Sequence, residues 1–280
     1  MTEVGVSMEA INPVRFAPAG RIAQRFVAAR LNAMALAEFP GPIPPDMASG
    51  YDCQEAALAL WPEEIVGWKI GRIPPAFESK LGQTRLAGVI FPSGVQRATA
   101  EVEFGVFAGG FAAVEAEYIY EIAKDAPAGQ LRWSPSEAAA IAGRMFVGIE
   151  TAGSPLATIN VLGPTVVVSD FGNNAGLILG PEVPNWRDRE PVSLTCESFI
   201  DDKPVGQGTA ANIPGGPLGA LQFILEHCAK RGRPLKEGML ISTGAATGIH
   251  DIVAGQKARA EFKGIGTVCG LAKPRAAQKP

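Results

Sequence analysis

Histidine is scarce in this chain of 280 residues, which contains only His227 and His250. Two histidines leave few candidates for the base of a serine triad and too few ligands for a histidine-rich metal site. The four cysteines are widely spaced and form no C-x-x-C pair. That spacing argues against a zinc site or a disulfide framework and favours a reducing compartment. We expect a cytoplasmic protein whose thiols are free.

Several sequence features of other protein classes are also missing. No uninterrupted apolar run approaches the roughly 18 residues that a membrane span requires. The first dozen residues, MTEVGVSMEAIN, resemble neither a secretory signal nor a transit peptide. The net charge of -3 offers no attractive field for nucleic acid or anionic lipid. Neither a phosphate-binding loop nor a dinucleotide fingerprint is present. We therefore expect no membrane or nucleic-acid partner, and a small-molecule substrate.

The residues that are present divide the chain into three parts. Residues 1–62 are predicted to form a helical N-terminal segment, with one amphipathic helix from Pro13 to about Glu38 and a shorter one over CQEAALALWP, from Cys53 to Pro62. Residues 63–271 contain short apolar stretches broken by glycines, including TVVVSDFG, which indicate a strand-rich domain. The ends, residues 1–12 and 272–280, have the composition of flexible tails. This organisation predicts an α+β protein with a mixed, largely antiparallel sheet.

Two helices interrupt the strand-rich domain. Ser134 and Glu137 have the spacing of a capping box, which predicts a helix from this point to about Phe146. The stretch GPLGALQFILEHCAKRG has apolar residues on one face, and Gly232 follows it at a position typical of a helix C-terminus.

Acidic side chains occupy one face of a predicted strand in VEAEYIYEIAKD, residues 114–125. Apolar and aromatic residues occupy the alternate positions, so that face is predicted to be buried and the acidic face to meet solvent or a cleft. Glu115 and Glu117 are two residues apart, roughly 6 to 7 Å along the strand, and could hold a divalent ion between them. An ordinary exposed strand face is the alternative.

Two further residues are candidates for the same site. Glu150 follows the apolar run Phe146 to Ile149, and a third carboxylate beside Glu115 and Glu117 would need a cation to remain ionised. Lys69 lies between apolar residues in GWKIG. It is a surface lysine unless it points into the cleft, where burial and an ion would lower its pKa and allow proton transfer. His250 follows a glycine-rich turn and could line a pocket.

Five segments in this order resemble the fumarylacetoacetate hydrolase superfamily, in particular its 2-oxopent-4-enoate hydratase and 4-oxalocrotonate decarboxylase branch. These segments are GWKIG, VEAE, GIE, SDFGNNAGLILG and LISTGAATG. The resemblance covers the chain from about Tyr51 to Val268 and implies a mixed β-sheet roll. It also implies a Mg²⁺ or Mn²⁺ ion on Glu115, Glu117 and Glu150.

The resemblance further implies that a 2-oxo acid chelates the ion and that Lys69 acts as a proton-transfer or electrostatic residue. Asn174, Thr243 and His250 are weaker candidates for substrate binding. The implied activity is that of a hydratase acting on a 2-hydroxy-2,4-dienoate in aromatic catabolism. The main alternative is decarboxylation of a 2-oxo-3-enedioate. Related proteins are commonly homo-oligomers and associate with pathway partners.

One departure from the resemblance concerns acid and base chemistry. Relatives in the hydratase branch usually carry an aspartate eighteen residues after the lysine, where this chain has Ala87, and RIPP (72–75) replaces a segment in which Thr and Ser are common. Either the substrate differs or another group, such as Glu78 or His250, moves the proton. A non-catalytic partner subunit is a further alternative. A C–C hydrolase is less favoured, since no histidine precedes Glu115.

Overall fold

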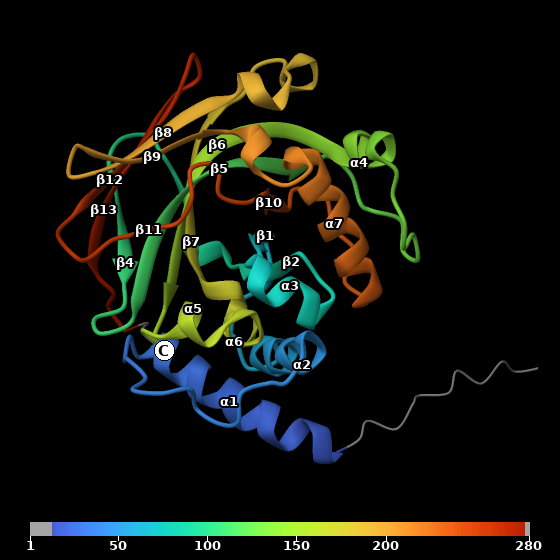
Figure 1. Cartoon of the computed structure of the whole chain (residues 1–280), viewed down its shortest axis with the longest axis vertical. Coiled ribbons are helices and arrows are strands. Elements are labelled where there is room, and N and C mark those ends of the chain that lie inside the picture. Colours follow the sequence, from blue (N-terminus) through green and yellow to red (C-terminus); the bar gives the residue numbers. More distant parts are fainter. Residues whose placement is uncertain (1–12, 278–280) are drawn as a thin grey trace, which may run out of the picture.

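The computed structural model describes residues 13–277, which form two β-sheets with helices packed around them (Figure 1). The helices are α1 (Pro13–Leu31), α2 (Met47–Leu58), α3 (Pro75–Leu81), α4 (Pro135–Ile141), α5 (Ile159–Leu162), α6 (Pro164–Ser169) and α7 (Gly216–Lys230). The strands are β1 (Gly67–Arg72), β2 (Arg85–Ile90), β3 (Val95–Arg97), β4 (Val102–Val106), β5 (Phe111–Ile122), β6 (Ala142–Ser154), β7 (Asn174–Glu182), β8 (Thr195–Ile200), β9 (Lys203–Thr209), β10 (Leu240–Ser242), β11 (His250–Asp251), β12 (Lys257–Phe262) and β13 (Gly266–Pro274).

The larger sheet has eight strands, of which seven follow the order β2-β1-β10-β5-β6-β7-β3 while β11 pairs with β5. Its centre is the antiparallel pair of long strands β5 and β6, in which Glu115 lies directly opposite Glu150. The pair β1 and β10 is parallel, as is β3 with β7. Eight consecutive residues of β5, from Ala113 to Tyr120, are buried, so both faces of the strand are covered there. The α+β class with a mixed sheet is confirmed.

The second sheet has five strands in the order β4-β13-β12-β8-β9. Residues alternate between buried and accessible along β8 and β12, as expected when one face packs on the core and the other faces outward. Its inner face contributes Val268 and Phe262 to the main hydrophobic core. This sheet therefore closes one side of the molecule and leaves the centre of the larger sheet enclosed.

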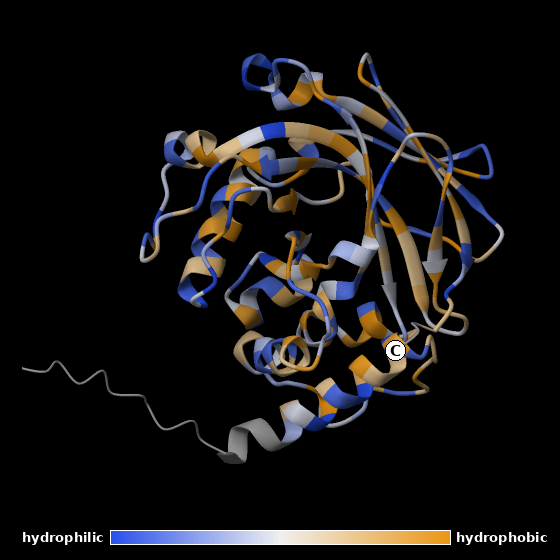
Figure 2. Ribbon diagram, turned by 180° about the vertical axis from the view of Figure 1, so that it is seen from behind, coloured by the Kyte–Doolittle hydropathy of each residue, from blue (hydrophilic) through white to orange (hydrophobic). Residues whose placement is uncertain are grey.

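Helices α1 and α2 lie together at one end of the molecule, next to α5 and α6 (Figure 1). Apolar and polar residues are mixed along α1 (Figure 2), and its apolar residues Ile22 and Phe26 belong to a separate core cluster with Phe39, Leu156 and Ile159. The helical N-terminal segment thus packs on the elements that follow β6. No helix among the described residues has both the length and the apolar character needed to cross a membrane.

Several predicted boundaries were wrong. Helix α1 ends at Leu31 instead of Glu38, because Ala33 takes a left-handed backbone with φ of 52°. The second helix begins earlier than predicted, since Asp46 caps it by accepting a hydrogen bond of 2.8 Å from the Ser49 amide. It also ends before Pro62, at Leu58.

The capping box at Ser134 is confirmed, but its helix α4 ends at Ile141 instead of about Phe146, where β6 takes over and pairs with β5. Gly232 follows the C-terminal end of α7 as predicted, and its backbone is left-handed, with φ of 70°.

Two predictions about strands and tails were also wrong. The segment TVVVS, expected in a strand, belongs to helix α6, which Pro164 begins. The C-terminal tail does not start at residue 272, because β13 continues to Pro274 in a parallel pair with β4. The predicted tail at residues 1–12 lies outside the described residues.

Candidate metal centre and substrate cavity

Three buried carboxylates meet at the centre of the larger sheet. Glu115 and Glu117 come from β5 and Glu150 from β6, and one oxygen of each lies within 4.8 Å of the others. Their exposed fractions are 7%, 0% and 0%. The acidic face of β5 is therefore not an ordinary exposed strand face. The alternation along β5 places Glu115 and Glu117 on one face, and the register with β6 brings Glu150, 33 and 35 positions away in sequence, beside them.

Hydrogen bonds from neighbouring elements hold two of these carboxylates in place. Glu117 Oε2 accepts bonds from Ser242 Oγ at 2.6 Å and from the Gly244 amide at 2.8 Å. Glu150 Oε1 accepts a bond of 2.9 Å from the side-chain amide of Asn174. The other oxygen of Glu117 is buried without a hydrogen-bond donor. An unsatisfied buried carboxylate oxygen calls for an explanation, and a cation provides one.

Lys69 reaches this cluster from β1, and its Nζ lies 3.1 Å from Glu150 Oε2. The lysine is 4% exposed, so the alternative of a surface lysine is wrong. Burial lowers the Lys69 pKa, as the sequence analysis expected, but the negative charges of Glu150, Glu115 and Glu117 outweigh burial and raise the pKa above its ordinary value. Lys69 therefore carries its proton at neutral pH.

The carboxylates show the electrostatic strain expected of a cation site. Burial, together with the charges of Glu150 and Glu115, raises the pKa of Glu117 well above its ordinary value. Burial also raises the pKa of Glu150 to about 7, although the Lys69 charge opposes this shift. A divalent ion would allow all three groups to stay ionised. The oxygen-only donor set and the unsatisfied oxygen of Glu117 fit Mg²⁺ or Mn²⁺.

A cavity of about 520 Å³ opens beside the cluster, and Lys69 and Glu115 are among its lining residues. This volume suits a small organic ligand. Thr243, one of the weaker candidates, lines the cavity and donates a hydrogen bond of 2.7 Å to the Tyr118 carbonyl.

The other two weaker candidates lie outside the cavity lining. Asn174 instead holds Glu150, and its neighbour Asn173 lines the cavity. His250 lies 3.2 Å from the Thr247 hydroxyl through its Nε2 and is close enough to Glu115 to feel its charge, although burial has the larger effect and lowers its pKa.

Ala87, which stands where related proteins have an aspartate, does not line the cavity, and neither does Glu78, which was suggested as a substitute acid. Ala87 pairs with Ile70 in the β1–β2 ladder, whereas Lys69 pairs with Gly88. Successive side chains of a strand alternate between faces, so position 87 faces away from the lysine. Glu78 lies on α3 and is not among the residues that line the cavity.

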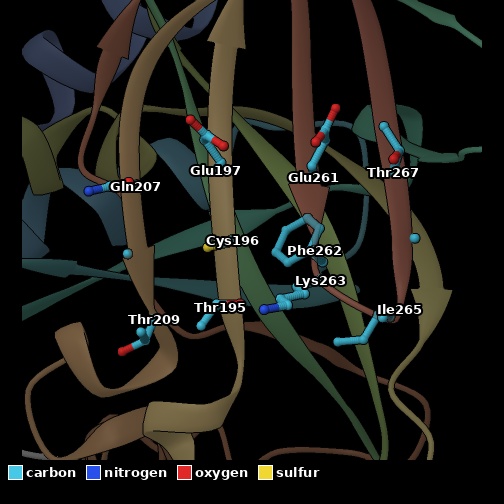
Figure 3. Close-up of a pocket in the computed structure, with 13 residues that line it drawn as sticks. Thr195, Cys196, Glu197, Gln207, Thr209, Glu261, Phe262, Lys263, Ile265 and Thr267 are labelled. Carbon is cyan, nitrogen blue, oxygen red and sulfur yellow. The ribbon is translucent and has the colours of Figure 1, made fainter.

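A second, larger hollow of about 910 Å³ lies on the outward face of the five-stranded sheet (Figure 3). Glu197, Glu261 and Thr267 lie side by side there on neighbouring strands. Glu261 forms an ion pair with Arg259, and Glu197 and Glu261 both have access to solvent. Among the described residues, no buried carboxylate or lysine lines this hollow, so the chemistry belongs to the smaller cavity.

A buried ion pair that the sequence analysis missed supports the site. Arg30 of α1 pairs with Asp170 and donates hydrogen bonds of 2.9 Å to the carbonyls of Asn174 and Gly153. Ser154 Oγ adds a bond of 2.6 Å to Asp170. This network fixes the start of β7, from which Asn174 reaches Glu150. The sequence places Arg30 on the apolar face of an amphipathic helix, which indicates a buried arginine but does not identify Asp170 as its partner.

Comparison with known proteins gives sequence similarity to two kinds of enzyme. Over 232 residues, 81% of this chain, it is 25% identical to 2-keto-4-pentenoate hydratase 2 of Dechloromonas aromatica (strain RCB), covering 86% of that protein. Over 104 residues it is 30% identical to a 4-oxalocrotonate decarboxylase of Pseudomonas sp., but this match spans only 39% of that protein and 36% of this chain. The chain matches no protein-family model.

Solved structures show the same fold. The 4-oxalocrotonate decarboxylase of Pseudomonas putida G7, complexed with magnesium and adipate, has a TM-score of 0.77 at 18% identity, covering 94% of this chain and 99% of that one. Fumarylpyruvate hydrolase of Pseudomonas aeruginosa, in complex with Mn²⁺ and pyruvate, has a TM-score of 0.56 at 14% identity, covering 74% of this chain and 89% of that one. The resemblance read from the motifs is confirmed: in sequence and in fold, the chain is similar to the hydratase and decarboxylase branch of the fumarylacetoacetate hydrolase superfamily.

Proposed function

We propose that this protein is a divalent-metal-dependent hydratase that adds water to a 2-hydroxy-2,4-dienoate or its 2-oxo-enoate tautomer. The observation that carries the proposal is the group of three buried carboxylates with a buried lysine at the wall of a cavity of about 520 Å³. The hydratase similarity, which covers most of both chains, supports the choice of reaction.

Glu115, Glu117 and Glu150 would hold the ion. Bound there, Mg²⁺ or Mn²⁺ would supply Lewis-acid chemistry, drawing electron density from the oxygens of a 2-oxo acid. Ser242, Gly244 and Asn174 fix the carboxylates through hydrogen bonds. Supporting contacts of this kind orient ligands and contribute to metal affinity.

Lys69 would act as a cationic hydrogen-bond donor toward the substrate oxygens. Its ammonium group, 3.1 Å from Glu150, would stabilise negative charge that develops at the 2-oxo position and could give up a proton there. Gly88 is the cross-strand partner of Lys69 and leaves room for the lysine stem, since a Cβ atom at position 88 would lie 2.8 Å from Lys69 Cγ.

The proposed reaction is balanced by one water molecule. The enol proton leaves the 2-oxygen and a proton is added at C5, which produces a double bond between C3 and C4 in conjugation with the 2-oxo group. The hydroxyl of water then adds to C4 and a proton to C3. The product is a 4-hydroxy-2-oxo acid, and no oxidant or reductant is needed.

Decarboxylation is the second candidate, favoured by the 30% identity to a 4-oxalocrotonate decarboxylase over 104 residues. In that reaction the electrons released as CO₂ leaves are accepted by the 2-oxo group, so the same carboxylates and Lys69 would serve it. The metal centre alone does not separate the two reactions.

Turnover of two substrates tests the proposal. The purified protein is mixed with 2-hydroxypenta-2,4-dienoate or with 2-oxohex-3-enedioate, with Mg²⁺ and then with a chelator, and ultraviolet absorbance and CO₂ release are followed. The proposal predicts metal-dependent loss of the conjugated chromophore without CO₂. Release of CO₂ would favour the decarboxylase, and no change with either substrate would contradict both candidates.

A further inference from the structure

A buried side-chain amide in the cavity wall has an oxygen with no partner. Asn173 lines the cavity and is 3% exposed, and its Oδ1 atom accepts no hydrogen bond. Its Nδ2 group donates one long hydrogen bond, of 3.4 Å, to Asn160 Oδ1. A buried polar atom without a partner costs free energy and is rare in native proteins. A ligand that enters the cavity with a donor would satisfy this oxygen.

The backbone holds this amide in place through an unfavourable turn. Phe171, Gly172 and Asn173 have φ of 51°, 70° and 63°, so three successive residues are left-handed and two of them are not glycine. The residues on either side of the turn, Asp170 and Asn174, are anchored by the buried ion pair and by the carboxylate cluster. The turn therefore presents the Asn173 side chain at a fixed place in the cavity wall.

This turn lies beside the groups that would bind the 2-oxo end of the substrate. A Cβ atom at position 88 would lie 2.8 Å from Gly172 Cα and 2.8 Å from Lys69 Cγ, so the turn and the lysine stem pack on the same point of β2. The residue after the turn, Asn174, donates a hydrogen bond to one of the three carboxylates. The Asn173 amide is thus close to the reacting end of a small acid.

Most other polar side chains of the cavity wall have no free acceptor. Thr243 and Thr247 already form hydrogen bonds within the protein. The lysine and the two arginines of the wall are donors only. Among the described lining residues, Asn173 and Glu115 therefore remain as buried side-chain acceptors, and Glu115 would hold the ion.

We propose that Asn173 Oδ1 accepts a hydrogen bond from the water that adds to C4, and from the C4 hydroxyl that this water becomes in the product. This inference deepens the proposed function and rests on it. The carboxylate and the 2-oxo group of the product offer only acceptor oxygens, which suit the ion and Lys69, whereas the new hydroxyl is a donor. The amide orients the water and does not take its proton.

The unpartnered acceptor also bears on the choice of reaction. Hydration brings a donor to C4, two carbons from the 2-oxo group, and thereby gives the buried oxygen of Asn173 a partner. Decarboxylation adds no hydroxyl to the substrate and leaves this oxygen without one. The Asn173 amide therefore favours hydration, a distinction that the metal centre does not make.

Affinities for two matched acids test this role without relying on turnover. Calorimetric titration of the Mg²⁺-loaded protein would compare 4-hydroxy-2-oxopentanoate with 2-oxopentanoate, which differ only in the C4 hydroxyl. One hydrogen bond to a neutral acceptor is expected to make the hydroxy acid bind about three- to tenfold more tightly.

Three variants locate the partner of the hydroxyl. Asn173→Gly removes the amide and should bring the preference close to unity, while glycine adopts the left-handed backbone freely and keeps the turn. Asn173→Asp retains an acceptor oxygen and tolerates the same backbone, so it should keep the preference, and its charge acts equally on the two monoanions. Asn185→Gly is the matched control, because Asn185 is an exposed left-handed asparagine, with φ of 51°, outside the cavity lining. It should bind both acids as the unaltered protein does.

Four results would overturn the proposal. Equal affinity of the unaltered protein for the two acids would remove this role of Asn173 while leaving the proposed function intact. A preference that survives in Asn173→Gly would assign the hydroxyl to another residue. Loss of the preference in Asn173→Asp as well as in Asn173→Gly would show that an acceptor oxygen is not what matters there. Binding of neither acid to the Mg²⁺-loaded protein would reject the proposed function, and the role of Asn173 with it.

Discussion

Replacing Arg30 by methionine should destabilise the protein by about 3 to 5 kcal/mol, because it would leave Asp170 as an unpaired charge in the interior. Arg30 is 3% exposed and Asp170 is 0% exposed, so water cannot replace the lost partner. The carbonyls of Asn174 and Gly153 would lose their bonds to the guanidinium as well. Methionine keeps an unbranched apolar stem in place of the arginine stem, so the loss measures mainly the guanidinium, with its charge and hydrogen bonds.

Chemical denaturation followed by far-ultraviolet circular dichroism measures this loss in free energy of unfolding, and thermal denaturation measures it as a shift in melting temperature. In a protein of this size each kcal/mol corresponds to roughly 2 to 4 °C, so the melting temperature should fall by at least roughly 6 °C. Arg25→Met, at an exposed site on the same helix, is the control and should change stability little. The double variant Arg30→Met with Asp170→Asn should lose less than the sum of the two single variants.

A loss in Arg30→Met within about 1 kcal/mol of the Arg25→Met control would refute the reasoning, since breaking a buried ion pair costs more than this. Additive losses in the double variant would also contradict it, because they would show that the two groups do not interact.

Three other predictions address the site and the pH dependence of stability. Lys69→Met should leave metal affinity intact and slow turnover by at least about a hundredfold, and normal turnover would remove the lysine from the mechanism. Gly88→Ala places a Cβ atom 2.4 Å from the Phe171 carbonyl oxygen and 2.8 Å from Lys69 Cγ; we expect a loss of about 1 to 3 kcal/mol and slower turnover, and an unchanged melting temperature would contradict the close packing. Burial, with the charge of Arg231 adding to it, lowers the His227 pKa to about 3. The stability that this histidine contributes is therefore complete above about pH 6.5 and falls by about 2 kcal/mol by pH 5. His227→Gln should flatten this part of the stability curve, and an identical pH dependence in both proteins would show that another group is responsible.

The carboxylate cluster could be predicted from the sequence because it depends on short-range patterns. Alternation along β5 puts Glu115 and Glu117 on one face whatever surrounds the strand. The order of the motifs then supplied Glu150 and Lys69. Periodicity alone could not have shown that this acidic face is buried, since the burial is produced by β6, β7 and the second sheet, which are distant in sequence.

The arginines illustrate what sequence patterns leave out. Arg30 and Asp170 are 140 residues apart, and nothing in either local sequence points to the other. Arg72 and Arg85 became a pair only through the register of β1 with β2. RIPP could be recognised from the sequence as a departure from related proteins, but only the structure shows that its first residue, Arg72, lines the cavity. Similarly, TVVVS has the composition of a strand, and its place between Pro164 and the buried Asp170 network makes it a helix instead.

Binding of Mn²⁺ to the metal-free protein tests the metal centre most directly. Calorimetric titration should show one ion per chain, with Glu117→Gln weakening the affinity by at least about a hundredfold, since even groups that only support metal ligands account for 10- to 100-fold. Glu121→Gln, on the same strand but paired with Arg144 at the surface, is the matched control and should bind normally. Unchanged affinity in Glu117→Gln would contradict the assignment of the ion to Glu115, Glu117 and Glu150.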